Sequence, residues 1–416
     1  MPKLRFPGFE EAWAEKNIDS ILVRASNGFQ PDLDGTYREI GVRSHGRGIF
    51  HKEAVLGAAL GEKRVFHVIP NALVLNIVFA WEQAVALTTD REKGFIASHR
   101  FPMFLEREGR SYLPFILELL LTKRGKQLLE MASPGGAGRN KTLGQQEFLR
   151  LKVKVPQRIE QKKIAAFLRA MDEKLGILRK KRDLLATYKR GVMQLLFSQT
   201  FRFKHDDGTD FPDWEEKRLG EVFDWVRTNN LSREHLTHQG GEIQNIHYGD
   251  IHTKFKANFR QAEESVPFIS PSAGISGFAD EEFCRLGDVV IADASEDYAD
   301  IGKAIEVVNV RDKSLVAGQH THLARPKSQQ TALGFSGYLL RSAPMRRQIV
   351  RVAQGISVLG ISKTNLERLI LWLPHPDEQR RIADFLSALD TKIEAVAQQI
   401  TQTDAFKKGL VQQMFL

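Results

Sequence analysis

The stretch Pro156–Phe197 decides the fold, because the chain contains it a second time as Pro374–Phe415. The first copy reads PQRIEQKKIAAFLRAMDEKLGILRKKRDLLATYKRGVMQLLF, and the second reads PHPDEQRRIADFLSALDTKIEAVAQQITQTDAFKKGLVQQMF. Matching residues are separated by 218 positions throughout, without a gap. A repeat of this length indicates a chain made of two variable halves, each followed by one copy of a shared segment.

Each shared segment is predicted to be one long helix, because apolar residues recur at intervals of three and four. About 37 residues at about 1.5 Å per residue make a rod of about 55 Å. Two matching apolar seams in one chain most simply pack on each other. If the two helices are antiparallel, they separate the variable halves and relate them by a pseudo-twofold axis. The seam positions are Ile164, Leu168, Met171, Leu175, Leu178, Leu185, Val192 and Leu196, with Ile382, Leu386, Leu389, Ile393, Val396, Ile400, Leu410 and Met414.

The repeat also extends in front of each helix. Apolar residues alternate up to a proline in both copies, which predicts a strand before the helix. Each half also opens with a similar phrase, Phe6-Pro7 before Trp13 and Phe211-Pro212 before Trp214. The alternating residues are Phe148, Leu151, Val153 and Val155 in the first copy, and Leu366, Leu369, Leu371 and Leu373 in the second.

Composition limits the class of protein. The 416 residues include 60 Lys and Arg against 51 Asp and Glu, a net charge of +9 that suits a polyanionic partner. The single cysteine, Cys284, excludes an internal disulfide and predicts a core thiol in a reducing compartment. The apolar stretches are too short to span a bilayer, so we expect a cytoplasmic protein without a membrane partner.

The repeated P-x-x-x-E-Q-x-x-I-A-x-F-L-x-x-(M/L)-D motif, placed after each of two dissimilar halves, resembles the specificity subunits of type I restriction-modification systems. The resemblance spans nearly the whole chain. It implies a mixed α/β fold, with two target-recognition domains separated by two long antiparallel coiled-coil helices in an internal pseudo-twofold repeat. The implied boundaries are 1–155 and 201–373 for the two target-recognition domains, and 156–200 and 374–416 for the central and C-terminal spacer helices.

The resemblance also implies a function and a set of partners. Each variable half reads one part of a split site on double-stranded DNA, and the chain itself carries no catalytic centre. Two methyltransferase subunits, which modify adenine, bring S-adenosylmethionine, and restriction subunits bring ATP and Mg²⁺. The sequence agrees in one respect, since it lacks both the glycine-rich cofactor turn and an Asn-Pro-Pro-Tyr-like motif of a methyltransferase.

Two groups of residues are candidates for these roles. The DNA-binding candidates are chosen as loop residues of the types that contact bases and phosphates. The residues that both copies share at the start of the repeat are assigned to the subunit-interface helices. The DNA-binding candidates are Arg43, His45, Arg47, His99, Arg100, Arg139, Asn140, Lys141, His247, Tyr248, His252, Lys254, His320 and His322; the interface candidates are Glu160, Gln161, Ile164, Phe167 and Leu168, with Glu378, Gln379, Ile382, Phe385 and Leu386.

Three competing interpretations are weaker. Gly135–Thr142 resembles a phosphate-binding loop but has Asn140 where the second glycine should be. His320 and His322 have the spacing of metal ligands on a strand, yet no carboxylate cluster of regular spacing accompanies them. Asp293, with its acidic neighbours, lacks the lysine of a nuclease site. A divergent stand-alone DNA-modifying enzyme and a helical scaffold that does not read DNA remain the alternative functions.

Overall fold

A computed structural model describes the chain except for residues 1, 108, 136–140, 276, 328–329 and 416. The chain forms two compact units, which are described separately below. The first consists of Met1–Arg179 with Gln398–Leu416, and the second of Lys180–Ala397. The boundary therefore divides both copies of the repeat, so that the last part of the chain folds with the first half.

The first unit is mixed α/β and has three sheets among its described residues. A two-stranded ladder, β1-β11, pairs Ala14–Asn17 with Lys152–Val155. The four-stranded sheet β2-β10-β7-β8 comprises Leu22–Ala25, Met103–Glu106, Leu73–Leu75 and Val85–Leu87. The five-stranded sheet β3-β6-β9-β4-β5 comprises Gly28–Phe29, Val65–His67, Ile96–Ser98, Thr36–Val42 and Ile49–Leu56. Its short helices are α1 (Ile18–Ile21), α2 (Leu113–Leu121), α3 (Lys123–Met131) and α4 (Gln145–Arg150).

The second unit has four sheets in its described part. Its ladder β12-β24 pairs Glu215–Arg218 with Ile370–Leu373, in the position that β1-β11 has in the first unit. The five-stranded sheet β13-β22-β18-β20-β16 comprises Phe223–Val226, Thr321–Pro326, Val289–Ala292, Ala304–Asn309 and Asn258–Arg260. The sheets β14-β17-β15-β21 and β19-β23 comprise Leu236–Thr237, Phe268–Ile269, Gln244–Ile246 and Leu315–Ala317, and Ala294–Ser295 with Leu359–Gly360. Its short helices are α6 (Leu219–Val222), α7 (Tyr248–Thr253), α8 (Ser336–Arg341), α9 (Ala343–Val352) and α10 (Lys363–Glu367).

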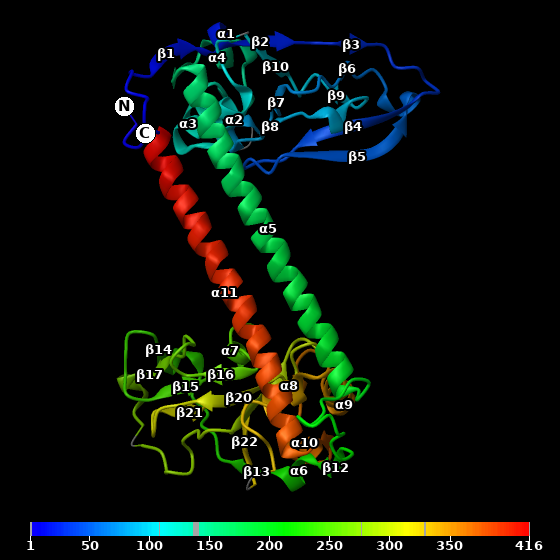
Figure 1. The fold of residues 1–416 in the computed structure, drawn as a ribbon, viewed down its shortest axis with the longest axis vertical. Coiled ribbons are helices and arrows are strands. Elements are labelled where there is room, and N and C mark those ends of the chain that lie inside the picture. The colour runs from blue at the N-terminus through cyan, green and yellow to red at the C-terminus, as the bar shows by residue number, and fades with distance from the viewer. Residues whose placement is uncertain (1, 108, 136–140, 276, 328–329, 416) are drawn as a thin grey trace. The chain divides into compact units, whose positions relative to one another are not determined.

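The two repeated segments form the long helices α5 (Arg158–Phe197) and α11 (Pro376–Phe415), of 40 residues each (Figure 1). Both begin within the first three residues of the quoted repeat and end at its final phenylalanine, which confirms the predicted helices. No helix in the described residues is both long enough and apolar enough to cross a membrane.

The strand predicted ahead of each helix is shorter than expected. Only Lys152–Val155 and Ile370–Leu373 are extended, whereas Phe148 lies in α4 and Leu366 in α10. The physical reason is the spacing, since Phe148 is three residues before Leu151, which suits a helical turn rather than the alternation of a strand. Phe148 is nevertheless fully buried, so the prediction of an apolar strip was right and only its conformation was wrong.

Cys284 lies in a hydrophobic cluster of the second unit with Val290 and Leu315. Burial raises the pKa of its thiol well above the ordinary value, so the sulfur stays protonated. This confirms the prediction of a core thiol.

Candidate nucleic-acid interface

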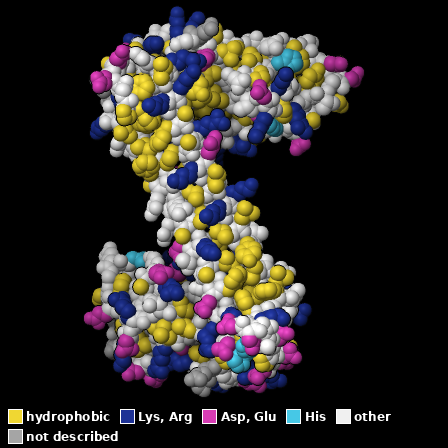
Figure 2. Space-filling view, in the orientation of Figure 1, with side chains coloured by type: hydrophobic (Ala, Val, Ile, Leu, Met, Phe, Trp, Pro, Cys, Tyr) yellow, Lys and Arg dark blue, Asp and Glu magenta, His cyan; other side chains and the backbone are white. Residues whose placement is uncertain are grey.

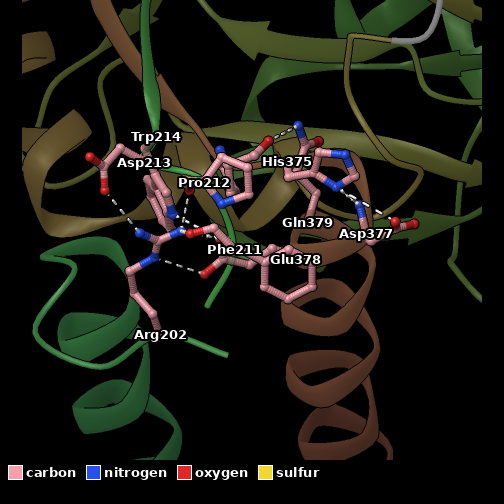
Figure 3. A network of polar contacts seen from close by, with 10 residues as sticks. Arg202, Phe211, Pro212, Asp213, Trp214, His375, Asp377, Glu378 and Gln379 are labelled. Carbon is pink, nitrogen blue, oxygen red and sulfur yellow. Dashed lines mark hydrogen bonds and ion pairs between the residues drawn. The ribbon is translucent and has the colours of Figure 1, made fainter. Parts of the chain in front are cut away.

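The start of each long helix is held by a buried carboxylate that receives an arginine from a preceding segment. In the first unit, Arg5 donates from Nε and Nη2 to Glu160 at 2.9 and 2.7 Å. In the second, Arg202 donates to both oxygens of Glu378, at 3.2 and 2.8 Å. The indole Nε1 of Trp214 also donates to Glu378 at 3.1 Å (Figure 3). The first turns of each long helix are thereby attached to the unit in which that helix begins.

A glutamine follows each of these carboxylates and bonds to the backbone. Gln161 accepts from the N–H of Tyr112 at 2.9 Å, and its amide nitrogen donates to the carbonyl of Pro156 at 2.9 Å. Gln379 does the same with the N–H of Ala332 at 2.7 Å and the carbonyl of Pro374 at 2.9 Å. The Glu-Gln pair in the repeat motif therefore serves the internal attachment of both helices.

The sequence predicts that the start of each repeat is a contact surface for other subunits, and within this chain its side chains already have internal partners. Eight of the ten predicted side chains are buried inside the chain, and the two phenylalanines are partly buried against Phe6 and Phe203. A buried side chain that already has internal partners is not available to another protein. The buried residues are Glu160, Gln161, Ile164, Leu168, Glu378, Gln379, Ile382 and Leu386, and the partly buried ones are Phe167 and Phe385.

In the second unit, four predicted DNA-binding residues from distant segments come together around one aromatic ring. The ring of Tyr248 lies 4.6 Å from that of His247, 5.6 Å from that of His252 and 5.2 Å from that of His320, between centroids. His320 has a positive φ of 55° and is exposed, so its imidazole is presented to solvent at the end of the turn before β22. The sequence prediction selected these residues, and the fold brings them to one place.

His247 is an anchor of this cluster rather than its outer surface. Its ring nitrogen Nδ1 accepts from the N–H of Gly249 at 3.1 Å and so caps α7. Burial, followed by the nearby Arg233 charge, lowers the pKa of His247 to about 4. Since Nδ1 is an acceptor, the neutral ring carries its proton on Nε2. The prediction that His247 contacts DNA directly is corrected, because its side chain is almost fully buried.

Lys254 and His322 are also engaged within the unit. Asp250 is buried between Arg233 at 2.7 Å and Lys254 at 2.8 Å; burial alone would raise its pKa, but these two cations lower it. His322 donates from Nε2 to the carbonyl of Ile361 at 3.0 Å. Of the residues predicted from this half, Lys254 and His320 are exposed, and Tyr248, His252 and His322 are half-buried.

Asp293 joins the turn carrying His320 to the strand β23. Its carboxylate lies 3.3 Å from Nδ1 of His320 and 3.8 Å from Nε2 of His322. Its backbone carbonyl accepts from the N–H of Ile361 at 2.9 Å. Among the residues that the structure describes, no group of three or more His, Cys, Asp or Glu side chains could hold a metal ion.

In the first unit, Arg43, His45 and Arg47 occupy the turn between β4 and β5, and all three side chains are exposed. The turn is pinned by the N–H of His45, which donates to the carbonyl of Glu82 at 2.7 Å. Gly46 has a φ of +64°, and a Cβ there would lie 2.6 Å from the side chain of Leu121. Glycine is therefore required for the turn to pack this closely.

The other predicted residues of the first unit lie on two further segments. Lys141 sits over the ring of Trp81, 5.4 Å from Nζ to the centroid, next to Glu82. His99 and Arg100 are exposed on the turn between β9 and β10, where the carbonyl of Arg100 accepts from the N–H of Ile77 at 3.0 Å. The predicted Arg139 and Asn140 lie outside the described residues.

Sequence reasoning did not identify Arg5 and Arg202 as partners of the repeat. A signal was present in the repeated Glu-Gln pair, because a glutamate that becomes buried requires a cation or hydrogen-bond donors. Sequence reasoning also did not identify Arg233 as the partner of Asp250, since the two residues meet only when the loop that carries Arg233 is folded.

Comparisons with known proteins agree with this architecture. Residues 212–403 match the family described as the type I restriction modification DNA specificity domain. The chain is 26% identical over 274 residues to the specificity subunit of the type I restriction enzyme MjaVIII from Methanocaldococcus jannaschii. That alignment covers 64% of this chain and 61% of the relative, so the match spans less than two thirds of the relative's length.

Solved structures resemble the chain over nearly its whole length. The HsdS subunit from Thermoanaerobacter tengcongensis matches with a TM-score of 0.53 and 16% identity, over 99% of this chain and 98% of that one. The type I restriction-modification S subunit from M. genitalium matches with a TM-score of 0.57 and 13% identity, over 100% and 99%. At these identities the likeness concerns the fold.

Proposed function

We propose, from the premise that this chain belongs to the family of type I restriction-modification specificity subunits, that it recognises a two-part sequence on double-stranded DNA. The observation that carries the proposal is the cluster around Tyr248, where His252 and His320 from separate segments both contact the tyrosine ring. Imidazole and phenol groups offer both donors and acceptors to base edges.

Each unit reads one half of the target with its own loops. In the first unit, Arg43, Arg47 and Arg100 are long exposed cations suited to guanine edges or phosphates. In the second, the candidate readers are the exposed His320 and the half-buried Tyr248 and His252, so this set carries less positive charge. This difference supports different sequence preferences for the two half-sites.

We also propose that α5 and α11 pair as an antiparallel coiled coil, and that the two halves are pseudo-twofold copies. Asp172 contacts Lys407 within the first unit, and Lys189 contacts Asp390 within the second. Residue numbers thus rise along α5 as they fall along α11. Both contacts join the same two positions of the repeat, as a twofold relation requires.

The methyltransferase subunits dock, in this proposal, on the outer face of the helices rather than on the buried repeat start. Leu184, Tyr188 and Leu195 of α5 are exposed at 60%, 54% and 45%, and they share one face of the helix at spacings of four and seven. An added Cβ at Gly191, on the same face, would meet nothing within 4 Å. Figure 2 shows hydrophobic and basic side chains exposed along this helical region. An apolar face of this kind suits an amphipathic helix of a partner.

The chemistry is then supplied by partners in the cytoplasm. Two methyltransferase subunits bring S-adenosylmethionine to adenine, and restriction subunits bring ATP and Mg²⁺. The chain contributes recognition and assembly only.

Genome-wide mapping of methylated bases tests the proposal, using the chain co-expressed with its methyltransferase subunit. We expect a split motif with a fixed gap, one half of which changes when residues 1–155 are exchanged for those of a relative, and the other when residues 201–373 are exchanged. An intact complex that methylates without a motif would support the helical scaffold instead. Binding of S-adenosylmethionine by the isolated chain would favour the stand-alone enzyme.

A further inference from the structure

A short loop in the second unit presents a fully exposed isoleucine. Between α9 and β23, the chain turns through Gly355, Ile356, Ser357 and Val358. Ile356 has a relative exposure of 102% and Val358 of 58%, whereas the following Leu359 is buried at 2%. Single exposed apolar residues are common and need no function by themselves. The surroundings of this one provide the further evidence.

The loop has a closed base. The N–H of Gln354 donates to the carbonyl of Gly360 at 2.9 Å, and the N–H of Gly360 donates back to Gln354 at 2.7 Å. Gly355 has a φ of +130°, and a Cβ there would lie 2.0 Å from the carbonyl oxygen of Val358. The loop is therefore held in a tight turn that keeps Ile356 at its tip. A side chain held in this way loses little conformational freedom when it binds.

The base of this loop is part of the same structure as the histidine cluster. β23 pairs with β19, so that Ser295 lies opposite Leu359. Beyond the strand, the backbone of Ile361 bonds to both Asp293 and His322. Asp293 in turn contacts His320, the exposed reader beside Tyr248. The apolar tip and the polar readers are thus supported by one set of contacts.

Exposed cations stand on both sides of the tip in the sequence. Arg347 and Arg351 lie one turn apart on α9, and Lys363 is the first residue of α10. All three are exposed. Exposed cations on the segments that flank an apolar tip suit a polyanion such as DNA, because cations bind phosphates and an apolar side chain can contact a base. An apolar protein partner would not require this arrangement.

We propose that Ile356 is a specificity-determining residue that contacts the 5-methyl group of a thymine in the half-site read by the second unit. The inference rests on the proposed function and adds to it one base and one chemical group. The thymine methyl is the apolar feature of the major groove, and aliphatic side chains contact it there. Burying one methyl group is worth about 0.8 kcal/mol, which corresponds to a three- to fivefold change in affinity.

The test uses the full chain purified with its methyltransferase subunits, and duplexes carrying the mapped target in which each thymine is replaced in turn by deoxyuridine. For the wild-type complex, we expect a three- to fivefold loss of affinity at one thymine of the second half-site. Ile356→Ala should bind the thymine and deoxyuridine duplexes equally. Val358→Ala is the matched control and should keep the wild-type response.

Each other outcome rejects the inference in a recognisable way. A half-site without thymine, or equal binding of all duplexes by the wild type, overturns the role of Ile356 but leaves DNA reading intact. If deoxyuridine has no effect, but the fluorescence of a 2-aminopurine placed beside the site rises on binding, Ile356 inserts between base pairs instead. Loss of the methyltransferase from Ile356→Ala in size-exclusion chromatography assigns a protein contact. Absence of any sequence preference in the wild type rejects the proposed function itself.

Discussion

The ammonium group of Lys189 lies 2.6 Å from both carboxylate oxygens of Asp390, and the hydroxyl of Tyr338 donates to the same carboxylate at 2.7 Å. Lys189 also lies over the ring of Tyr338, 4.8 Å from its centroid. In the first unit the equivalent pair, Lys407 and Asp172, has the same 2.6 Å contacts, without an equivalent tyrosine among the recorded contacts of the described residues. One repeated pair is therefore placed in two different environments.

The two aspartates should differ in their contribution to stability. Asp390→Asn leaves Lys189 and Tyr338 without the carboxylate in a half-buried site, and we expect a loss of about 2–3 kcal/mol. Asp172 is half exposed, so Asp172→Asn should cost less than about 1 kcal/mol. Urea unfolding followed by tryptophan fluorescence measures both. Equal losses would show that Tyr338 adds nothing to the second pair.

The arginine–glutamate pairs should respond differently to removal and to replacement. Arg5→Met leaves the buried Glu160 unpaired and should cost about 3–5 kcal/mol, and Arg202→Met should do the same at Glu378. Adding Glu160→Leu to the first variant should recover most of the loss. Adding Glu378→Leu to the second should recover less, because the indole of Trp214 then loses its hydrogen-bond acceptor. In the first unit no such loss occurs, since Nε1 of Trp13 has no partner in the described structure. Thermal unfolding of the four variants decides this, and equal recovery in both units would contradict it.

The free energy of unfolding should decrease as the pH rises from about 4.5 to 7, because of Glu306. Its carboxyl is fully buried and accepts from the N–H groups of Gly334 at 2.6 Å and Gly337 at 2.9 Å. Burial raises its pKa to about 7, so in this window the folded chain holds a proton that the unfolded chain has released. The free energy of unfolding therefore decreases as pH rises through the window.

Glu306→Gln should remove this contribution to the pH dependence. Unfolding by urea at several pH values from 4.5 to 7.5 compares the variant with the wild type. Glu234→Gln, at an exposed position of the same unit, is the control and should keep the wild-type slope. An unchanged slope in Glu306→Gln would show that the buried carboxyl does not titrate in this window.

Single histidines should change single half-sites. In the proposed function His320 contacts one base, so His320→Ala should reduce discrimination at one base pair of the second half-site by about 1 kcal/mol, or fivefold. His99→Ala is the reciprocal variant and should affect only the other half-site. Methylation of a library of target variants by each complex measures both. A uniform decrease over all sequences would instead assign these residues to phosphates.

The exposed face of α5 should be needed for assembly. Tyr188→Asp places a charge in the apolar surface with Leu184 and should weaken methyltransferase binding by at least tenfold, since an unpaired buried charge costs several kcal/mol. Ile159→Asp, at a more exposed position near the start of α5, is the control. Sedimentation of the mixed subunits measures the change. Unimpaired binding by Tyr188→Asp would move the docking surface elsewhere.

The sequence by itself determined the two long helices and their ends, whereas the family resemblance implied the mixed α/β character of the chain. It could do so because a helical seam is a local pattern, and because a repeat of 42 residues at a constant offset specifies the same element twice. The loop residues around Tyr248 were selected as DNA-binding candidates on residue type and on the family resemblance, and only the fold brings them together.

Only the tertiary structure decided which of these side chains face solvent. The Glu-Gln motif looked like a contact surface, but Arg5 and Arg202 reach it from segments 155 and 176 residues away and bury it. His247 looked like a DNA contact, yet the fold uses it as a helix cap. Burial depends on which distant segments pack against a residue, and that is a property of long-range contacts that no local spacing encodes.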